Sequence, residues 1–231
     1  MNPSQLFPAL RFWWQKLPSL MLAGAPFLVL LSLIAMGFPP PVSDAGEAGP
    51  PVIRWDMLAL SGLVYTFFEG AVIGQLLALH HGKSRGPGAL MLFSLLLLPG
   101  LLLINIITYI GLVTGLALFI LPGVWIFVRL ALAPMILAAE QASPLMAIRA
   151  SFQRTRPLQL GMMADVMLLL LGYLGIIALT LSAVGEQPGN LAQLGFTTIE
   201  LLVAMALEVL VFHYYLLGWP RSPESEPPTT H

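Results

Sequence analysis

The chain has 231 residues, of which 58% are hydrophobic and only 9% are Asp, Glu, Lys or Arg. About a quarter of the residues in an ordinary soluble domain are charged, so too few charges remain here to cover a water-facing surface. With a mean hydropathy of +0.87, the composition excludes a soluble globular protein and a disordered chain. Ten basic against eleven acidic residues also leave no basic face for nucleic acid.

Residues 1–17 place Phe and Trp side chains beside Arg11 and Lys16. Aromatic rings next to cations are typical of the lipid headgroup layer, so we expect a short interfacial segment here. The apolar run 19–38 follows, and it is long enough to cross a hydrocarbon core of about 30 Å. No clear cleavage motif follows this run, so we expect it to be retained as the first transmembrane helix.

The segment 38–54 holds five prolines and two acidic residues, which predicts an aqueous loop. A second transmembrane helix is expected at 55–80. The segment 80–88 then predicts a polar, basic turn, because it carries two histidines, a lysine and an arginine between glycines.

The following stretch, 89–139, is almost continuously apolar. As one helix it would be about 75 Å long, far more than a bilayer, so it must fold back. We place the reversal near 108–115, which predicts a third helix at 89–110 and a fourth at 114–138. Each of these helices contains a Leu-Pro-Gly triplet, so kinks or short breaks are expected.

The pair Ser143-Pro144 predicts the start of a short amphipathic helix between the fourth and fifth transmembrane helices, ending at Pro157. One face of this helix is apolar, with Leu145, Ile148 and Phe152. Its three arginines are expected to contact lipid headgroups: Arg149, Arg154 and Arg156.

The last transmembrane helices are expected at 159–183 and 194–217, and residues 219–231 predict a disordered tail rich in Pro and Ser. The fold expected for 18–218 is therefore an all-α bundle of six transmembrane helices. Nine of the ten cations then fall on one side of the membrane, and Arg54 alone falls on the other. The positive-inside rule predicts that this basic side, with both termini, faces the cytoplasm.

Ionisable side chains within the spans are functional candidates, because burying one in a membrane costs roughly 2.5–3.5 kcal/mol. The candidates are Glu69, Asp165, Glu200, Glu208, His213 and Arg129. Glu69 and Glu208 are expected at similar depth on the second and sixth helices, where they could share a proton or a cation. Alternatively, each is neutral or hydrogen-bonded to a neighbouring helix. Asp165 with Arg129 is expected to form a structural pair.

Small residues at two sites favour close approach of helices. Gly70 and Gly74 predict such a contact on the second helix, whereas Gly111 and Gly115 fall at the presumed turn. The chain has no cysteine and no pair of histidines at metal-binding spacing, and it lacks nucleotide-binding and serine-hydrolase motifs. We therefore expect no metal, no cofactor and no catalytic residue.

The stretch 121–157 combines a Pro-Gly-broken helix, an Ala-Pro, an acidic residue and a short basic helix. It resembles the YciC-like family of uncharacterised bacterial inner-membrane proteins, and similar stretches occur in the membrane domain associated with some glycerophosphodiester phosphodiesterases. The resemblance implies a six-helix bundle in the bacterial plasma membrane and supplies no catalytic residue. The residues that carry it are Pro122, Gly123, Ala133, Pro134, Glu140, Ala147, Arg149, Ser151 and Thr155.

These observations favour a non-enzymatic protein of the inner membrane, a scaffold or accessory in envelope or lipid homeostasis. Its expected partners are membrane lipids, together with other membrane proteins or further copies of the chain. The alternative is a small transporter or proton-coupled permease that uses the intramembrane carboxylates and the broken helices. A lipid-modifying enzyme is the weakest alternative, because no nucleophile and base stand at a recognisable spacing.

Overall fold

The computed structural model describes residues 4–37, 42–43, 52–184 and 190–218. Nearly all of these residues are helical, and six of the described helical stretches are long and apolar enough to cross a membrane. This confirms the predicted all-α fold with six candidate spans. The predicted tail at 219–231 lies outside the described residues.

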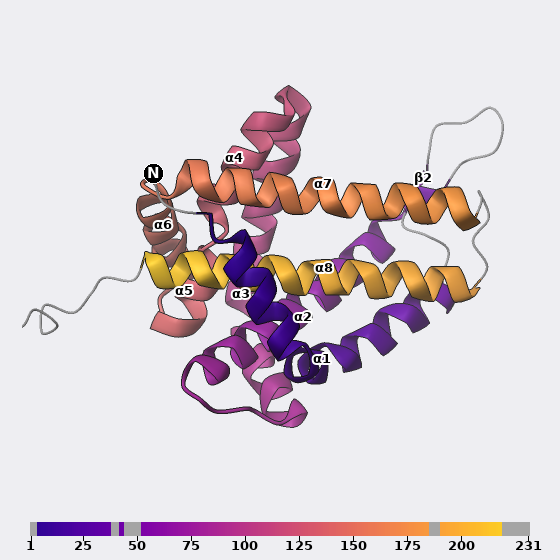
Figure 1. The fold of residues 1–231 in the computed structure, drawn as a ribbon, viewed down its shortest axis with the longest axis horizontal. Coiled ribbons are helices and arrows are strands. Elements are labelled where there is room, and N and C mark those ends of the chain that lie inside the picture. The colour runs from indigo at the N-terminus through magenta and orange to yellow at the C-terminus, as the bar shows by residue number, and fades with distance from the viewer. Residues whose placement is uncertain (1–3, 38–41, 44–51, 185–189, 219–231) are drawn as a thin grey trace, which may run out of the picture.

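Helix α1 covers Leu6–Gly37 and contains Pro18 and Pro26. The described part of the segment 1–17 and the first span form one continuous helix with a sharp bend, and the interfacial position of that segment stays a prediction (Figure 1). Each interior proline removes one backbone hydrogen bond and so bends a helix without necessarily ending it. Two short strands follow, β1 (Val42–Ser43) and β2 (Val52–Ile53), which pair antiparallel.

Helix α2 covers Trp55–His80, with the predicted bounds. The α2–α3 turn, 81–86, reverses the chain through Gly82, whose φ of +67° is readily adopted only by glycine. Helix α3 then covers Pro87–Leu118 and keeps Pro99 within it.

The chain reverses at Phe119, so the predicted turn near 108–115 is wrong. Gly111 and Gly115 lie inside α3 and face α4 (Ile120–Leu130). A Cβ on Gly115 would stand 2.5 Å from the Cα of Gly123, so these two backbones touch. Glycine therefore serves here to bring two helices together within the segment where the sequence analysis placed a turn.

The predicted fourth helix at 114–138 is also two helices in the structure, because α4 is followed by the separate α5 (Ala133–Glu140). The break falls just before Pro134, which occupies the first turn of α5, and not at the Pro122-Gly123 pair. The predicted short helix is confirmed as α6 (Pro144–Thr155). Helices α7 (Gln159–Val184) and α8 (Asn190–Leu217) complete the fold.

The helices pack mainly as neighbouring pairs: α1 with α8, α2 with α1 and α3, and α3 with α4. The first glycine motif is confirmed as a packing contact, because Gly70 lies against Ser94 and Gly74 against Phe93 of α3. Helices α7 and α8 run side by side, and the tip of the α3–α4 hairpin projects beyond α7 (Figure 1).

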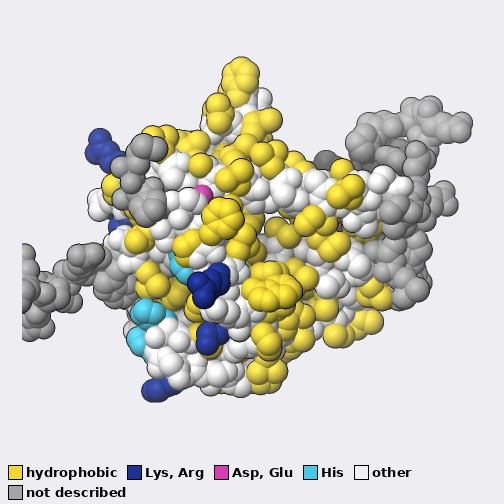
Figure 2. Space-filling view, in the orientation of Figure 1, with side chains coloured by type: hydrophobic (Ala, Val, Ile, Leu, Met, Phe, Trp, Pro, Cys, Tyr) yellow, Lys and Arg dark blue, Asp and Glu magenta, His cyan; other side chains and the backbone are white. Residues whose placement is uncertain are grey.

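The basic side chains gather toward one end of the molecule (Figure 2). Helix α6, the α2–α3 turn and the C-terminal end of α8 gather at the left of Figure 1, and we call this the basic end. The end of α7, the start of α8 and the β1–β2 strands lie at the opposite end. Lys, Arg and His side chains on the visible face cluster toward the basic end (Figure 2).

Candidate functional site

Glu69 is the best-connected carboxyl group in the middle of the bundle. Asn105 of α3 donates its amide N–H to Glu69 Oε2 at 2.6 Å and also approaches Thr66 Oγ1 at 3.2 Å. Thr66 in turn donates to the carbonyl of Gly62, one helical turn earlier. Glu69 thus has the neighbouring-helix hydrogen bond that one of the two sequence hypotheses expected.

Glu208 lies on α8, which packs against α2. Its carboxyl group is close enough to Glu69 for the two to interact electrostatically. Within the part of the chain that the structure describes, no hydrogen bond to Glu208 is formed. The two predicted carboxyl groups thus lie on packed helices within range of electrostatic interaction, and Glu69 has a hydrogen-bond donor.

Glu200 stands apart from that pair, on the exposed surface of α8. The Tyr65 hydroxyl of α2 donates to Glu200 Oε2 at 3.0 Å, and Tyr173 of α7 also interacts with this carboxylate. Glu200 thereby links three helices, a structural role that is sufficient to explain a carboxylate here.

Asp165 is 1% exposed and holds the start of α1. Its carboxylate accepts hydrogen bonds from the Ser4 hydroxyl at 2.6 Å, the Gln5 backbone N–H at 2.7 Å and the Tyr214 hydroxyl at 2.7 Å. The predicted pair with Arg129 is wrong. A carboxylate at a helix N-terminus is favourable because the first backbone N–H groups have no partner inside the helix.

Arg129 instead fastens α4 to α6. Its Nη1 donates to the carbonyl of Phe152 at 2.8 Å, and Ser151 Oγ donates to the carbonyl of Arg129 at 2.7 Å. The guanidinium also lies over the ring of Trp125, 5.1 Å from its centroid. His213 contacts α1, because its ring meets the Phe12 ring edge-on at 5.5 Å.

Helix α6 rests on the bundle through its small residues. Ala147, Ser151 and Thr155 are buried. The opposite surface, which we call the α6 stripe, is exposed and mixes apolar with basic side chains. The α6 stripe consists of Leu145, Met146, Arg149, Phe152, Gln153 and Arg156.

Arg154 lies outside that stripe and is paired with an acidic side chain, so its predicted contact with headgroups stays a prediction. Its two terminal nitrogens bind the two carboxylate oxygens of Glu140 at 2.5 and 2.9 Å. This hydrogen-bonded carboxylate raises the pKa of the Arg154 guanidinium above its ordinary value, so the cation persists. The Tyr215 hydroxyl donates to the same Glu140 carboxylate at 3.3 Å.

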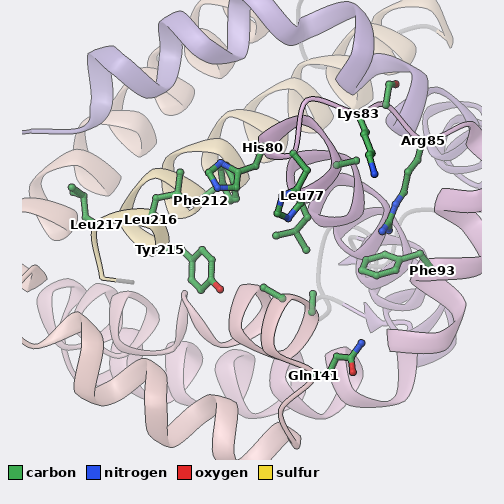
Figure 3. A pocket seen from close by; sticks show the side chains of 15 residues that line it. Leu77, His80, Lys83, Arg85, Phe93, Gln141, Phe212, Tyr215, Leu216 and Leu217 are labelled. Carbon is green, nitrogen blue, oxygen red and sulfur yellow. The ribbon is translucent and has the colours of Figure 1, made fainter. Parts of the chain in front are cut away.

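A cavity of about 850 Å³ opens at the basic end, between the α2–α3 turn, α5 and α8 (Figure 3). Lys83 and Arg85 extend from the turn on one side, and Phe212 and Tyr215 of α8 lie across from them. Gln141, which ends α5 in the left-handed conformation at φ +51°, forms part of the rim.

Buried Gln75 positions this turn, and the sequence analysis missed it. Its side-chain amide donates to Ser19 Oγ at 2.7 Å and Ser84 Oγ at 3.0 Å, and it accepts from the Arg85 backbone N–H at 3.2 Å. A glutamine in an otherwise apolar helix signals that it has partners, because a buried amide without them is costly. Among the described residues, no group of three or more His, Cys, Asp or Glu could hold a metal ion.

The chain is similar to curated bacterial membrane proteins. It is 29% identical over 155 residues to a UPF0259 membrane protein of Yersinia pestis (strain Pestoides F), covering 65% of this chain and 60% of that protein. A UPF0259 membrane protein of Yersinia pseudotuberculosis (serotype O:3, strain YPIII) matches to the same extent. The chain thus spans 60% of the length of these relatives. No family model matches the chain, and no solved structure matches it.

Proposed function

We propose that this chain is a non-enzymatic protein of the bacterial inner membrane, acting as a scaffold or accessory in envelope or lipid homeostasis. It is an integral membrane protein by its six candidate spans and by its similarity to UPF0259 membrane proteins. Its resemblance to the YciC-like family at 121–157 is consistent with that similarity. Contact with anionic lipids at the basic end is the central element of the proposal.

The observation that supports this proposal is the α6 stripe. Leu145 and Met146 are 68% and 67% exposed, and Arg149 and Arg156 lie exposed on the same side of the helix. Apolar side chains beside cations suit a helix that lies in the plane of the membrane surface. Each cation close to an anionic leaflet contributes about 1 kcal/mol to the attraction.

The test measures how deeply α6 lies in the bilayer. A fluorophore on Met146→Cys, in vesicles containing anionic lipid, should be quenched strongly by brominated lipids. Adding Arg149→Glu and Arg156→Glu should reduce that quenching to its level in neutral vesicles, whereas Arg149→Lys with Arg156→Lys should preserve it. If the charge-reversed variant is quenched as strongly as the parent in anionic vesicles, α6 does not act through surface charge.

A second candidate function is proton-coupled transport. The observation in its favour is the juxtaposition of Glu69 and Glu208 on adjacent helices, with Asn105 bound to Glu69. Intramembrane carboxyl groups of this kind often mark ion pathways.

Proton flux into proteoliposomes distinguishes the two functions. A transporter should lose flux in Glu69→Gln and in Glu208→Gln, while the control Glu200→Gln keeps it, because Glu200 is on the exposed surface of α8. Equal flux in the wild type and these variants, or no flux in any, removes the transport candidate.

A further inference from the structure

The cavity at the basic end has a rim that is basic. The lining residues from the end of α2 and the α2–α3 turn include two histidines and two cations, and all four are exposed: His80, His81, Lys83 and Arg85. Of the lining residues that the structure describes, none is acidic. The rim therefore favours a negatively charged group.

This rim is held in place before any ligand binds. Gln75 is 0% exposed and fixes both Ser84 and Arg85 through its side-chain amide. The backbone N–H of Lys83 donates to the carbonyl of Ala78 at 2.9 Å, which closes the end of α2. A loop that is already ordered loses less conformational entropy when it binds a ligand.

Below the rim the walls are apolar. Ala138 and Ala139 of α5 line the cavity together with Phe212 and Leu216 of α8. The Arg85 guanidinium lies 4.7 Å from the centroid of the Phe93 ring, so this cation stands at the boundary between rim and wall. A ligand that fits both surfaces carries an anionic group at one end and hydrocarbon at the other.

We propose that this cavity binds one anionic phospholipid of the adjacent leaflet, with its phosphate at Lys83 and Arg85 and the start of its acyl chains along α5 and α8. A volume of about 850 Å³ is typical of a small-molecule site, and basic pockets between transmembrane helices suit lipid headgroups. A soluble phosphate compound would leave the alanine and leucine walls without a matching group. The inference goes beyond the proposed function, because the α6 stripe meets a bilayer surface whereas the cavity takes one molecule.

The test uses the full chain, purified in detergent and titrated by native mass spectrometry. Three probes separate the two halves of the ligand: dioctanoyl phosphatidic acid, neutral dioctanoylglycerol and glycerol 3-phosphate. We expect one molecule of the phosphatidic acid to bind at least about tenfold more tightly than either of the others, because only it meets both rim and wall.

Two variants locate the site. Lys83→Gln with Arg85→Gln should weaken phosphatidic acid binding by about tenfold or more, since two cations near the phosphate are lost. The matched control, Arg11→Gln with Lys16→Gln, removes the same charge from exposed positions of α1 that do not line the cavity, and should change the affinity by less than about twofold. Ala139→Trp keeps every charge but fills the cavity, and should abolish binding while circular dichroism and gel filtration remain as in the wild type.

Three results would overturn the inference. The first is an equal loss of affinity in the two charge-neutralised variants, which would indicate a general electrostatic effect. The second is glycerol 3-phosphate binding as tightly as phosphatidic acid, which would indicate a soluble phosphate ligand. The third is a folded Ala139→Trp protein that binds like the wild type. Failure of the α6 depth measurement leaves these results unaffected, because the two experiments change different residues.

Discussion

Asp165 shows how one buried carboxylate can organise three segments that are distant in sequence. Its three partners all donate: the Ser4 hydroxyl, the Gln5 backbone N–H and the Tyr214 hydroxyl. Both carboxylate oxygens are therefore needed as acceptors. The bonds fasten the start of α1 to α7 and α8, so we assign Asp165 a structural role.

Asp165→Asn should destabilise the protein by about 1–3 kcal/mol, because an amide nitrogen would then face a donor inside the bundle. Tyr214→Phe removes a single donor and should cost less, about 0.5–1.5 kcal/mol. Thermal unfolding in detergent, followed by circular dichroism, gives the order of the two midpoints. An asparagine variant as stable as the phenylalanine variant would contradict this account of Asp165.

The sequence identified the polar side chains inside the spans more reliably than it identified their hydrogen-bond partners. Glu69, Asp165 and Glu208 were identifiable because charge is costly in a membrane. Asp165 was expected to pair with Arg129, the ionisable residue near the end of the fourth helix. The actual donors are a backbone amide and two hydroxyls, from segments whose proximity depends on the bend of α1 and on helix packing.

At the scale of elements, the α3–α4 hairpin depends on a contact between two glycine backbones. Gly115 and Gly123 touch, and the hairpin reverses through the single extended residue Phe119, with φ −166° and ψ 160°. Side chains at its tip are apolar and largely exposed, including Phe119 at 77% and Leu121 at 64%. Such a tip suits contact with lipid better than contact with water.

Gly115→Ala should separate α3 from α4 and destabilise the protein by about 1–3 kcal/mol, because its methyl group would meet backbone that cannot move aside cheaply. Gly172→Ala and Gly175→Ala are matched controls within α7, where an added Cβ meets nothing within 4 Å. They should be neutral or mildly stabilising, because the helix propensity of alanine exceeds that of glycine by about 1 kcal/mol. Detergent unfolding midpoints that fall equally for Gly115→Ala and the controls would refute the role of this contact.

Helix boundaries were predicted correctly where polar residues mark them and were missed where none do. The bounds of α2 and the existence of α6 followed from charged or proline-rich flanks. The reversal at Phe119 could not be found in this way, because no polar residue marks it within a long apolar run. The turn was therefore placed at 108–115, where the structure instead has Gly111 and Gly115 in contact with α4.

For the whole molecule, the number of candidate spans was predictable because it follows from length and hydropathy alone. The packing of the spans was not predictable, because an apolar side chain that contacts lipid cannot be distinguished in the sequence from one that contacts another helix. The prediction that nine of ten cations share the cytoplasmic side is a statement about orientation, and it requires a direct experiment.

The chain lacks cysteine, so single introduced cysteines report orientation without background. Asp56→Cys should react with a membrane-impermeant maleimide on intact cells, whereas Gly88→Cys and Gln153→Cys should react only after permeabilisation. All three positions are exposed in the structure, so lack of reaction on intact cells reflects sidedness. Labelling of positions 56 and 88 from the same side would invalidate the orientation that both proposals assume.

Glu140 connects α6 to the wall of the cavity. It is held by Arg154 from α6 and by Tyr215, which lines the cavity wall. Displacement of Tyr215 by a lipid, or movement of α6 at the bilayer surface, would each remove a donor from this same carboxylate. If binding of α6 to lipid headgroups changes the affinity of the cavity for its lipid, the coupling is reciprocal. Occupancy of the cavity then changes the affinity of α6 for the bilayer by the same free energy. Cavity occupancy and the attachment of α6 would then be coupled through Glu140, so both would depend on the lipid composition of the membrane.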